Sequence, residues 1–207
     1  EITFASPQNV TQLYKDQISI NESLGKVIEK QLIFGPTYSY TYTNTAQKRK
    51  KHTFYYKGNV DLAGNITGLV TGANIAKGDT INIFKVPFSQ FIKIENDFRH
   101  YYKLGPDSQL ASRIIVGAGY AYGNSREMPF IKQFFIGGTN SLRAFRARSI
   151  GPGTFDGATT NTSTFLPDQS GDIKLEFNTE YRAKIYGLVK GALFLDAGNI
   201  WLLNDNA

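Results

Sequence analysis

The sequence is dominated by stretches in which apolar and polar side chains alternate with a period of two. Such alternation places successive side chains on opposite faces of a β-strand, so each stretch predicts a strand. We therefore predict an all-β, antiparallel fold. The stretches lie at residues 37–43, 53–62, 92–99, 113–120, 174–185 and about 188–202.

The polar faces of several predicted strands carry charges of both signs in mid-strand. In the range 92–99 these are two basic and two acidic residues, and the range 174–185 is similar. A soluble sandwich would often place apolar core there, whereas the lumen of a membrane barrel tolerates charge. Lipid on the other face would explain the rows of aromatic side chains, because tyrosine suits membrane interfaces. A sheet with one solvated face is the alternative, and alternation alone leaves it open.

Several functional classes are excluded by what the sequence lacks. No run approaches the roughly 20 apolar residues of a spanning helix, whereas a barrel strand needs only about 9–11. The start, residues 1–4, is not a signal peptide. Cysteine is absent, there is no G-x-S-x-G elbow, and His52 and His100 are the only histidines. We therefore predict no enzyme, no catalytic or metal site and no cofactor.

The connections between the predicted strands differ in length and polarity. Residues 105–108 and 185–187 read as tight turns, whereas 44–52 and 123–170 are long or strongly polar. Outer-membrane barrels pair short periplasmic turns with long outer loops. We therefore expect 44–52 on the outer side, its basic run forming a solvated loop tip or meeting lipid A phosphates. Residues 5–30 lack the alternation with a period of two, so we expect short helical turns there.

The connection at about 123–170 is too long for a hairpin and is predicted to be a functional, folded-in loop. Its segment 128–136 is apolar and aromatic, and Gly137 and Gly138 then supply a sharp change of direction. Leu142-Arg143-Ala144-Phe145 follows. A segment of this composition should pack against something, and within a barrel the available surface is the lumen. We therefore expect the loop to fold inward.

An arginine inside a barrel must find carboxylates, because an unpaired buried guanidinium is costly and a bidentate pair is strong. Glu180 and Asp196 lie on the polar faces of two strands joined through the turn at Gly187. We predict that both receive Arg143. The alternative is that Arg143 caps a solvent-exposed turn.

Four blocks of the sequence resemble the BamA/TamA type of outer-membrane assembly barrel, the bacterial surface-antigen family, and they follow one another in the order found in that family. This resemblance implies a transmembrane β-barrel of about sixteen strands, of which this chain supplies about six. It also implies that an outer loop tucks into the lumen and that its arginine contacts an acidic residue on each of the next two strands. The blocks are 129–145, 151–153, 171–182 and 194–201.

The chain departs from this family pattern in two respects. The family usually has glycine after the arginine, and here Ala144 takes its place. If that glycine normally has a positive φ, Ala144 would be strained. The second departure is length, which leads us to expect that 1–207 is part of one barrel domain, a fragment without the earlier strands, the final strands and the periplasmic repeats.

The resemblance implies a non-enzymatic barrel of the bacterial outer membrane that inserts or translocates other proteins. Expected partners are nascent outer-membrane proteins or other exported clients, accessory subunits, and lipid with lipopolysaccharide; despite the net charge of +6, no nucleic acid is expected. The alternatives are a patatin-like lipase anchor, a two-partner secretion transporter and a passive porin or soluble barrel. The predicted loop lock is Arg143, Glu180 and Asp196, with loop motif Gly137, Gly138, Leu142, Ala144 and Phe145 and wall motif Phe194 and Gly198.

Overall fold

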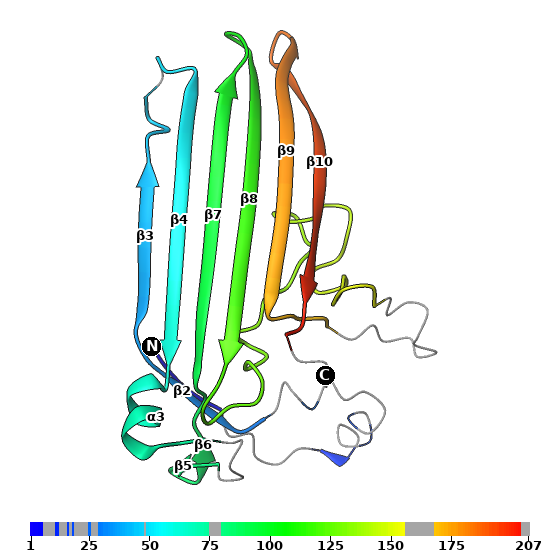
Figure 1. The fold of residues 1–207 in the computed structure, drawn as a ribbon. Coiled ribbons are helices and arrows are strands. Elements are labelled where there is room, and N and C mark those ends of the chain that lie inside the picture. The colour runs from blue at the N-terminus through cyan, green and yellow to red at the C-terminus, as the bar shows by residue number, and fades with distance from the viewer. Residues whose placement is uncertain are drawn as a thin grey trace.

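The fold is an antiparallel sheet of six long strands, seen in a computed structural model (Figure 1). The structure describes residues 1–5, 29–47, 49–74, 80–155 and 168–203, with 11, 12, 16, 18 and 25 singly. The prediction of six antiparallel strands is confirmed. The sheet is not closed, and its order is β10-β9-β8-β7-β4-β3. The strands are β3 (Thr37–Thr43), β4 (His52–Ala63), β7 (Phe91–Lys103), β8 (Ser108–Ala121), β9 (Ile173–Tyr186) and β10 (Val189–Trp201).

Strand pairing assigns the alternating side chains to two different faces of the sheet. On one face Asp61 lies opposite Lys93, and Asn178 lies opposite both Arg113 and Asp196. The other face is apolar and largely exposed, as expected for a surface in contact with lipid. One of its rows crosses five strands and consists of Tyr42, Tyr56, Phe98, Ile114 and Phe177.

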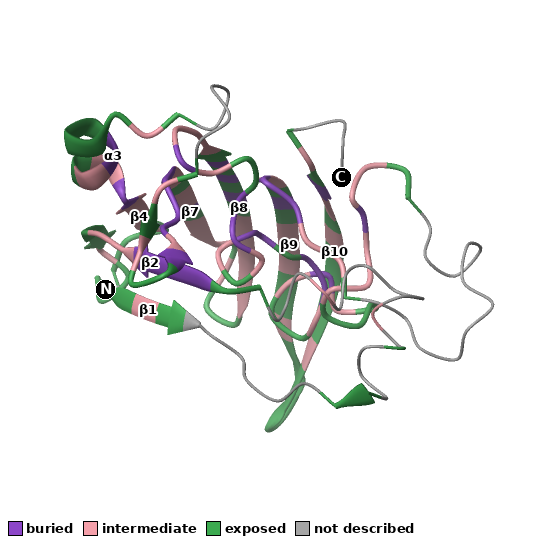
Figure 2. Ribbon diagram, turned by 90° about the horizontal axis from the view of Figure 1, so that it is seen from below, coloured by how far each residue is buried: buried purple, intermediate pink, exposed green. Residues whose placement is uncertain are grey.

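One end of the sheet is covered by short elements that the period-two pattern did not predict. The connection 64–90 contains the helix α3 (Asn65–Thr71) and the strand pair β5 (Asn82–Ile83) and β6 (Val86–Pro87). Beside it, β1 (Ile2–Ala5) pairs with β2 (Gln31–Phe34). Buried residues gather here on β2 and the nearby loops (Figure 2). They form two clusters, Leu32, Val86 and Phe88, and Ile33, Ala63, Phe91 and Met128.

The prediction that residues 44–52 lie on the same side as the long loop is wrong. The turns β3–β4, β7–β8 and β9–β10 share one end of the sheet, and the connections 64–90 and 122–172 share the other (Figure 1). Three antiparallel strands separate 44–52 from the long loop, and an odd number of strands brings the chain to the opposite end. The described part of the basic run, 49–52, is therefore at the tight-turn end. Because tight turns face the periplasm in outer-membrane barrels, we now expect it on the periplasmic side.

Two further expectations concern helices. The helical turns predicted at 5–30 fall largely outside the described residues. Within the described part of the chain, no helix is long and apolar enough to cross a membrane.

Single-cysteine labelling tests this orientation in a cysteine-free full-length protein. We expect Leu69→Cys, on exposed α3, to react in intact cells with a polyethylene-glycol maleimide too large for porins. Lys50→Cys, at the tight-turn end, should react only after the outer membrane is permeabilised. Labelling of Lys50→Cys in intact cells, with Leu69→Cys protected, would reverse the assignment.

Candidate functional site

The long loop packs against the charged face of the sheet through a small apolar cluster. Phe134, Ile136 and Leu142 of the loop are buried together with Ile200 of β10. The loop is also hydrogen-bonded to the chain before β9, since Phe134 and Gly171 exchange backbone bonds at 2.8 and 2.9 Å. Residues 134–142 of the loop are therefore packed against the sheet.

Glycines in β8 make room for the loop. A Cβ atom on Gly117 would lie 2.5 Å from Cζ of Phe134, and one on Gly119 would lie 2.9 Å from Cε of Met128. Neither distance is compatible with ordinary van der Waals contact. Because these glycines alternate along β8, the surface they leave faces the same side as the charged residues.

The double glycine turns the loop back toward the sheet. Gly137 and Gly138 have φ angles of 97° and 95°, which L side chains rarely adopt. The N–H of Gly138 donates to the carbonyl of Phe145 at 2.9 Å, closing the turn around Arg143. At Gly138 a Cβ would have ordinary room, 3.5 Å from Cβ of Ala147, so the glycine is required by its φ angle.

Ala144 is not strained. Among the described residues, the non-glycine positions with positive φ are Phe84, Lys85 and Arg148. Ala144 therefore adopts a backbone conformation open to any L residue, and the strain considered for it does not arise. Its neighbour Phe145 is exposed and takes no part in the buried cluster.

Arg143 lies between the two predicted carboxylates. Its Nε and Nη2 donate to the two carboxylate oxygens of Asp196, both at 2.9 Å, and its Nη1 donates to Glu180 at 2.5 Å. Its backbone N–H also donates to Asp196, at 3.2 Å. The hydrogen bonds to Asp196, followed by that to Glu180, raise the pKa of Arg143, so the guanidinium stays charged. The paired geometry is the fork that makes arginine–carboxylate contacts strong.

Phe194 completes the arginine's surroundings. The guanidinium carbon of Arg143 lies 3.7 Å from the centre of the Phe194 ring, a cation–π geometry. Phe194 on β10 is the cross-strand neighbour of Glu180 on β9, so the phenyl ring and the Glu180 carboxylate both contact the side chain of Arg143. The alternation placed Phe194 on the polar face, where an aromatic residue is unusual, but it did not identify the ring's partner.

A second group of contacts on β9 was missed by sequence reasoning. Glu176 is fully buried and accepts a hydrogen bond from the hydroxyl of Ser141 at 2.7 Å. Lys174 lies 3.1 Å from the same carboxylate. Asn178 donates to the carbonyl of Ser141 at 3.0 Å and to Asp196 at 3.1 Å. The signal available in the sequence was the spacing of two residues between these β9 side chains and Glu180, because it puts all of them on one face.

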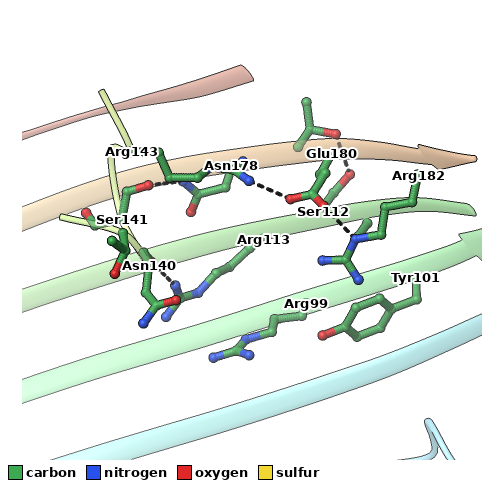
Figure 3. Close-up of a pocket in the computed structure, with 13 residues that line it drawn as sticks. Arg99, Tyr101, Ser112, Arg113, Asn140, Ser141, Arg143, Asn178, Glu180 and Arg182 are labelled. Atoms are coloured by element: carbon green, nitrogen blue, oxygen red, sulfur yellow. Dashed lines mark hydrogen bonds and ion pairs between the residues drawn. The ribbon is translucent and has the colours of Figure 1, made fainter. Parts of the chain in front are cut away.

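The loop is also tied to β7 and β8. Arg113 of β8 donates to the carbonyl of Asn140 at 2.9 Å and forms two hydrogen bonds with Asp97 of β7, at 3.1 and 2.7 Å. Asp97 is shared with Arg99. Figure 3 shows Arg99, Arg113 and Asn140, which line a cavity of about 170 Å³. Contacts from Arg143, Ser141 and Asn140 thus connect the loop, directly or through Arg113, to four neighbouring strands.

The chemistry of this site is that of a clamp. Arginines face carboxylates, and within the described ranges no group of three or more His, Cys, Asp or Glu side chains has a metal-binding arrangement. Removing one partner of these part-buried pairs would leave the other charge uncompensated. The arrangement can therefore hold the loop in one place against the wall.

Comparison with known proteins identifies the family. Residues 80–207, more than half of the chain, match the Omp85 superfamily domain. The chain belongs to the Omp85 superfamily. It is 27% identical over 161 residues to the outer membrane protein assembly factor BamA of Neisseria meningitidis serogroup B.

The alignment covers 70% of this chain and 19% of that relative, so the chain spans about a fifth of the relative's length. The resemblance to BamA/TamA-type barrels is confirmed, and so are the antiparallel barrel-type fold and the bacterial outer membrane as location.

Gly198 is a position on β10 against which the loop packs closely. A Cβ there would lie 2.6 Å from Cδ1 of Ile136 and 2.7 Å from the carbonyl oxygen of Leu175. We expect Gly198→Ala in the full-length protein to destabilise the barrel by about 1–3 kcal/mol through overpacking. The measurement is the temperature at which the folded band is lost on a semi-native gel.

Gly191→Ala is the matched control on the same strand, because its Cβ would meet only the flexible end of Ile185, at 2.8 Å from Cδ1. Gly191→Ala should lower the transition temperature less than Gly198→Ala does. Equal transition temperatures for the two variants would contradict the close approach of the loop to Gly198.

Ala144→Gly restores the residue usual in the family. Because Ala144 has no positive φ, we expect the change to destabilise the barrel slightly, by about 0.4–1 kcal/mol, through the greater freedom of glycine in the unfolded chain. The same gel transition measures it. A higher transition temperature would show that the alanine is strained after all.

Proposed function

We propose that this chain forms the loop-bearing wall of an outer-membrane barrel that inserts or translocates other proteins without catalysing a chemical reaction. The proposal is carried by one observation: the guanidinium of a long loop on the charged face of the sheet is shared between carboxylates of two neighbouring strands. The match to the Omp85 domain and the name of the similar relative, an assembly factor, support it.

In this proposal the loop acts as a brace. Protein insertion requires the barrel to open a strand edge to the client, which pairs with that edge by β-augmentation. Opening one part of a wall strains the rest. A loop connected to four adjacent strands keeps them in register, with Arg143 holding the brace and Glu180 and Asp196 anchoring it.

The proposed partners follow from the two faces of the sheet. The exposed apolar face would contact outer-membrane lipid and lipopolysaccharide. Nascent outer-membrane proteins or other exported clients would be the substrates, with accessory subunits at the periplasmic side. No cofactor is needed, because hydrogen bonds along the strand edge supply the interaction.

Arg143→Ala in the full-length protein tests the lock. We expect the loop to lose its anchor, the folded band to be lost at lower temperature, and the yield of client barrels in the membrane to fall several-fold. The control is Arg146→Ala, which removes an arginine from the same loop that is half exposed and paired with exposed Asp168. The control should leave both quantities near wild type.

The outcomes separate the alternatives. A passive porin predicts normal client yields in Arg143→Ala, and that result would overturn the assembly role. If the folded band is also unchanged, the lock itself is refuted. The double variant Arg143→Ala/Asp196→Ala adds a second check. Because the two residues are paired, its folded band should be lost at a temperature no lower than in the less stable of the two single variants.

A further inference from the structure

The tight-turn end of the charged face contains a groove surrounded by basic side chains. It lies between the β7–β8 turn and the ends of β9 and β10, with a volume of about 520 Å³. Its charged lining consists of Lys103, Arg182, Lys184 and Lys190 against the single carboxylate of Asp107. We refer to this feature as the basic groove. It borders the Arg143 site, because Arg182 of the groove donates to Glu180, which also accepts from Arg143.

The basic groove opens toward the lumen. Arg182 and Lys184 follow Glu180 at intervals of two along β9, and Lys190 is paired with Lys184. They therefore share the face that carries the loop. On the opposite face at this end, Ile185 and Leu193 are 70% and 75% exposed, as expected of lipid-facing residues. A bilayer therefore contacts the other side of the sheet, and the groove meets water at the periplasmic mouth.

The electrostatic field at this end is positive beyond the groove itself. The β3–β4 turn adds Arg49, Lys50 and Lys51 at the same end of the sheet, and the N–H of Lys103 donates to the carbonyl of Lys51 at 2.8 Å. Of the cations in the groove, Arg182 is paired with Glu180, at 2.7 Å, while Lys184 and Lys190 are exposed. A concave surface lined by one sign of charge concentrates ligands of the opposite sign.

We propose that the basic groove binds an acidic, extended segment of polypeptide at the periplasmic mouth of the barrel. The volume lies in the range of binding sites, about 300–1,000 Å³. Lysines act as flexible point charges, which suits several carboxylates in a row better than one rigidly held anion. The strands around the groove are pinned, because the N–H of Lys184 donates to the carbonyl of Asp107 at 3.0 Å. This partner site goes beyond the proposed brace and does not require it.

The test uses the full-length protein in nanodiscs of neutral lipid and a fluorescein-labelled deca-glutamate peptide, with binding followed by fluorescence anisotropy. The double variant Lys184→Gln/Lys190→Gln should bind the peptide about tenfold more weakly than wild type, and wild-type binding should weaken as salt screens the charges. The control Arg49→Gln/Lys50→Gln removes the same charge from the turn outside the groove and should change affinity less than about twofold.

Equal losses in both double variants would overturn the proposal, because they would show a diffuse field rather than a site. So would equal binding of a deca-glutamine peptide, or displacement of the acidic peptide by inorganic phosphate at equal charge, which would indicate a small-anion site. The folded gel band checks each variant. Normal client yield in Lys184→Gln/Lys190→Gln with weakened peptide binding would leave the brace intact, so the two proposals fail independently.

Discussion

The structure depends on the neutralisation of one arginine. A guanidinium in a barrel lumen is costly unless carboxylates and hydrogen-bond acceptors surround it. Arg143 is held by Asp196 on β10, Glu180 on β9 and the ring of Phe194. Because these partners come from adjacent strands, the contact fixes the loop and also links the strands to each other.

The rest of the site gives this contact its position. The apolar cluster around Ile136 and the room left by Gly117, Gly119 and Gly198 let the loop lie close to the wall. The hydrogen bond from Ser141 to buried Glu176 then orients the loop tip. The apolar packing brings the loop close to the wall, and the charged groups fix its orientation, so both determine where the loop lies.

Sequence reasoning predicted the six strands from a strict period of two, and the sheet confirms them. The same period put Glu180 and Asp196 on polar faces and left open whether Arg143 reaches them, and in the structure both accept hydrogen bonds from Arg143. Sequence reasoning missed the elements in 64–90, which are too short to have a period. It placed 44–52 at the wrong end, because it judged the connection by polarity instead of counting the strands between connections. Glu176 and Asn178 lay on the predicted polar face, but nothing local indicated that Ser141 of the loop would contact them, through its hydroxyl and its carbonyl respectively.

The sequence by itself determined which side chains share a face and where acidic partners for Arg143 were available, since alternation is a local property of extended backbone. Only the tertiary structure decided which end holds the basic turns, that Phe194 lies under the guanidinium, and that Arg113 reaches the loop at Asn140. Those outcomes depend on strand register and on contacts between segments far apart in the chain, which no local pattern encodes.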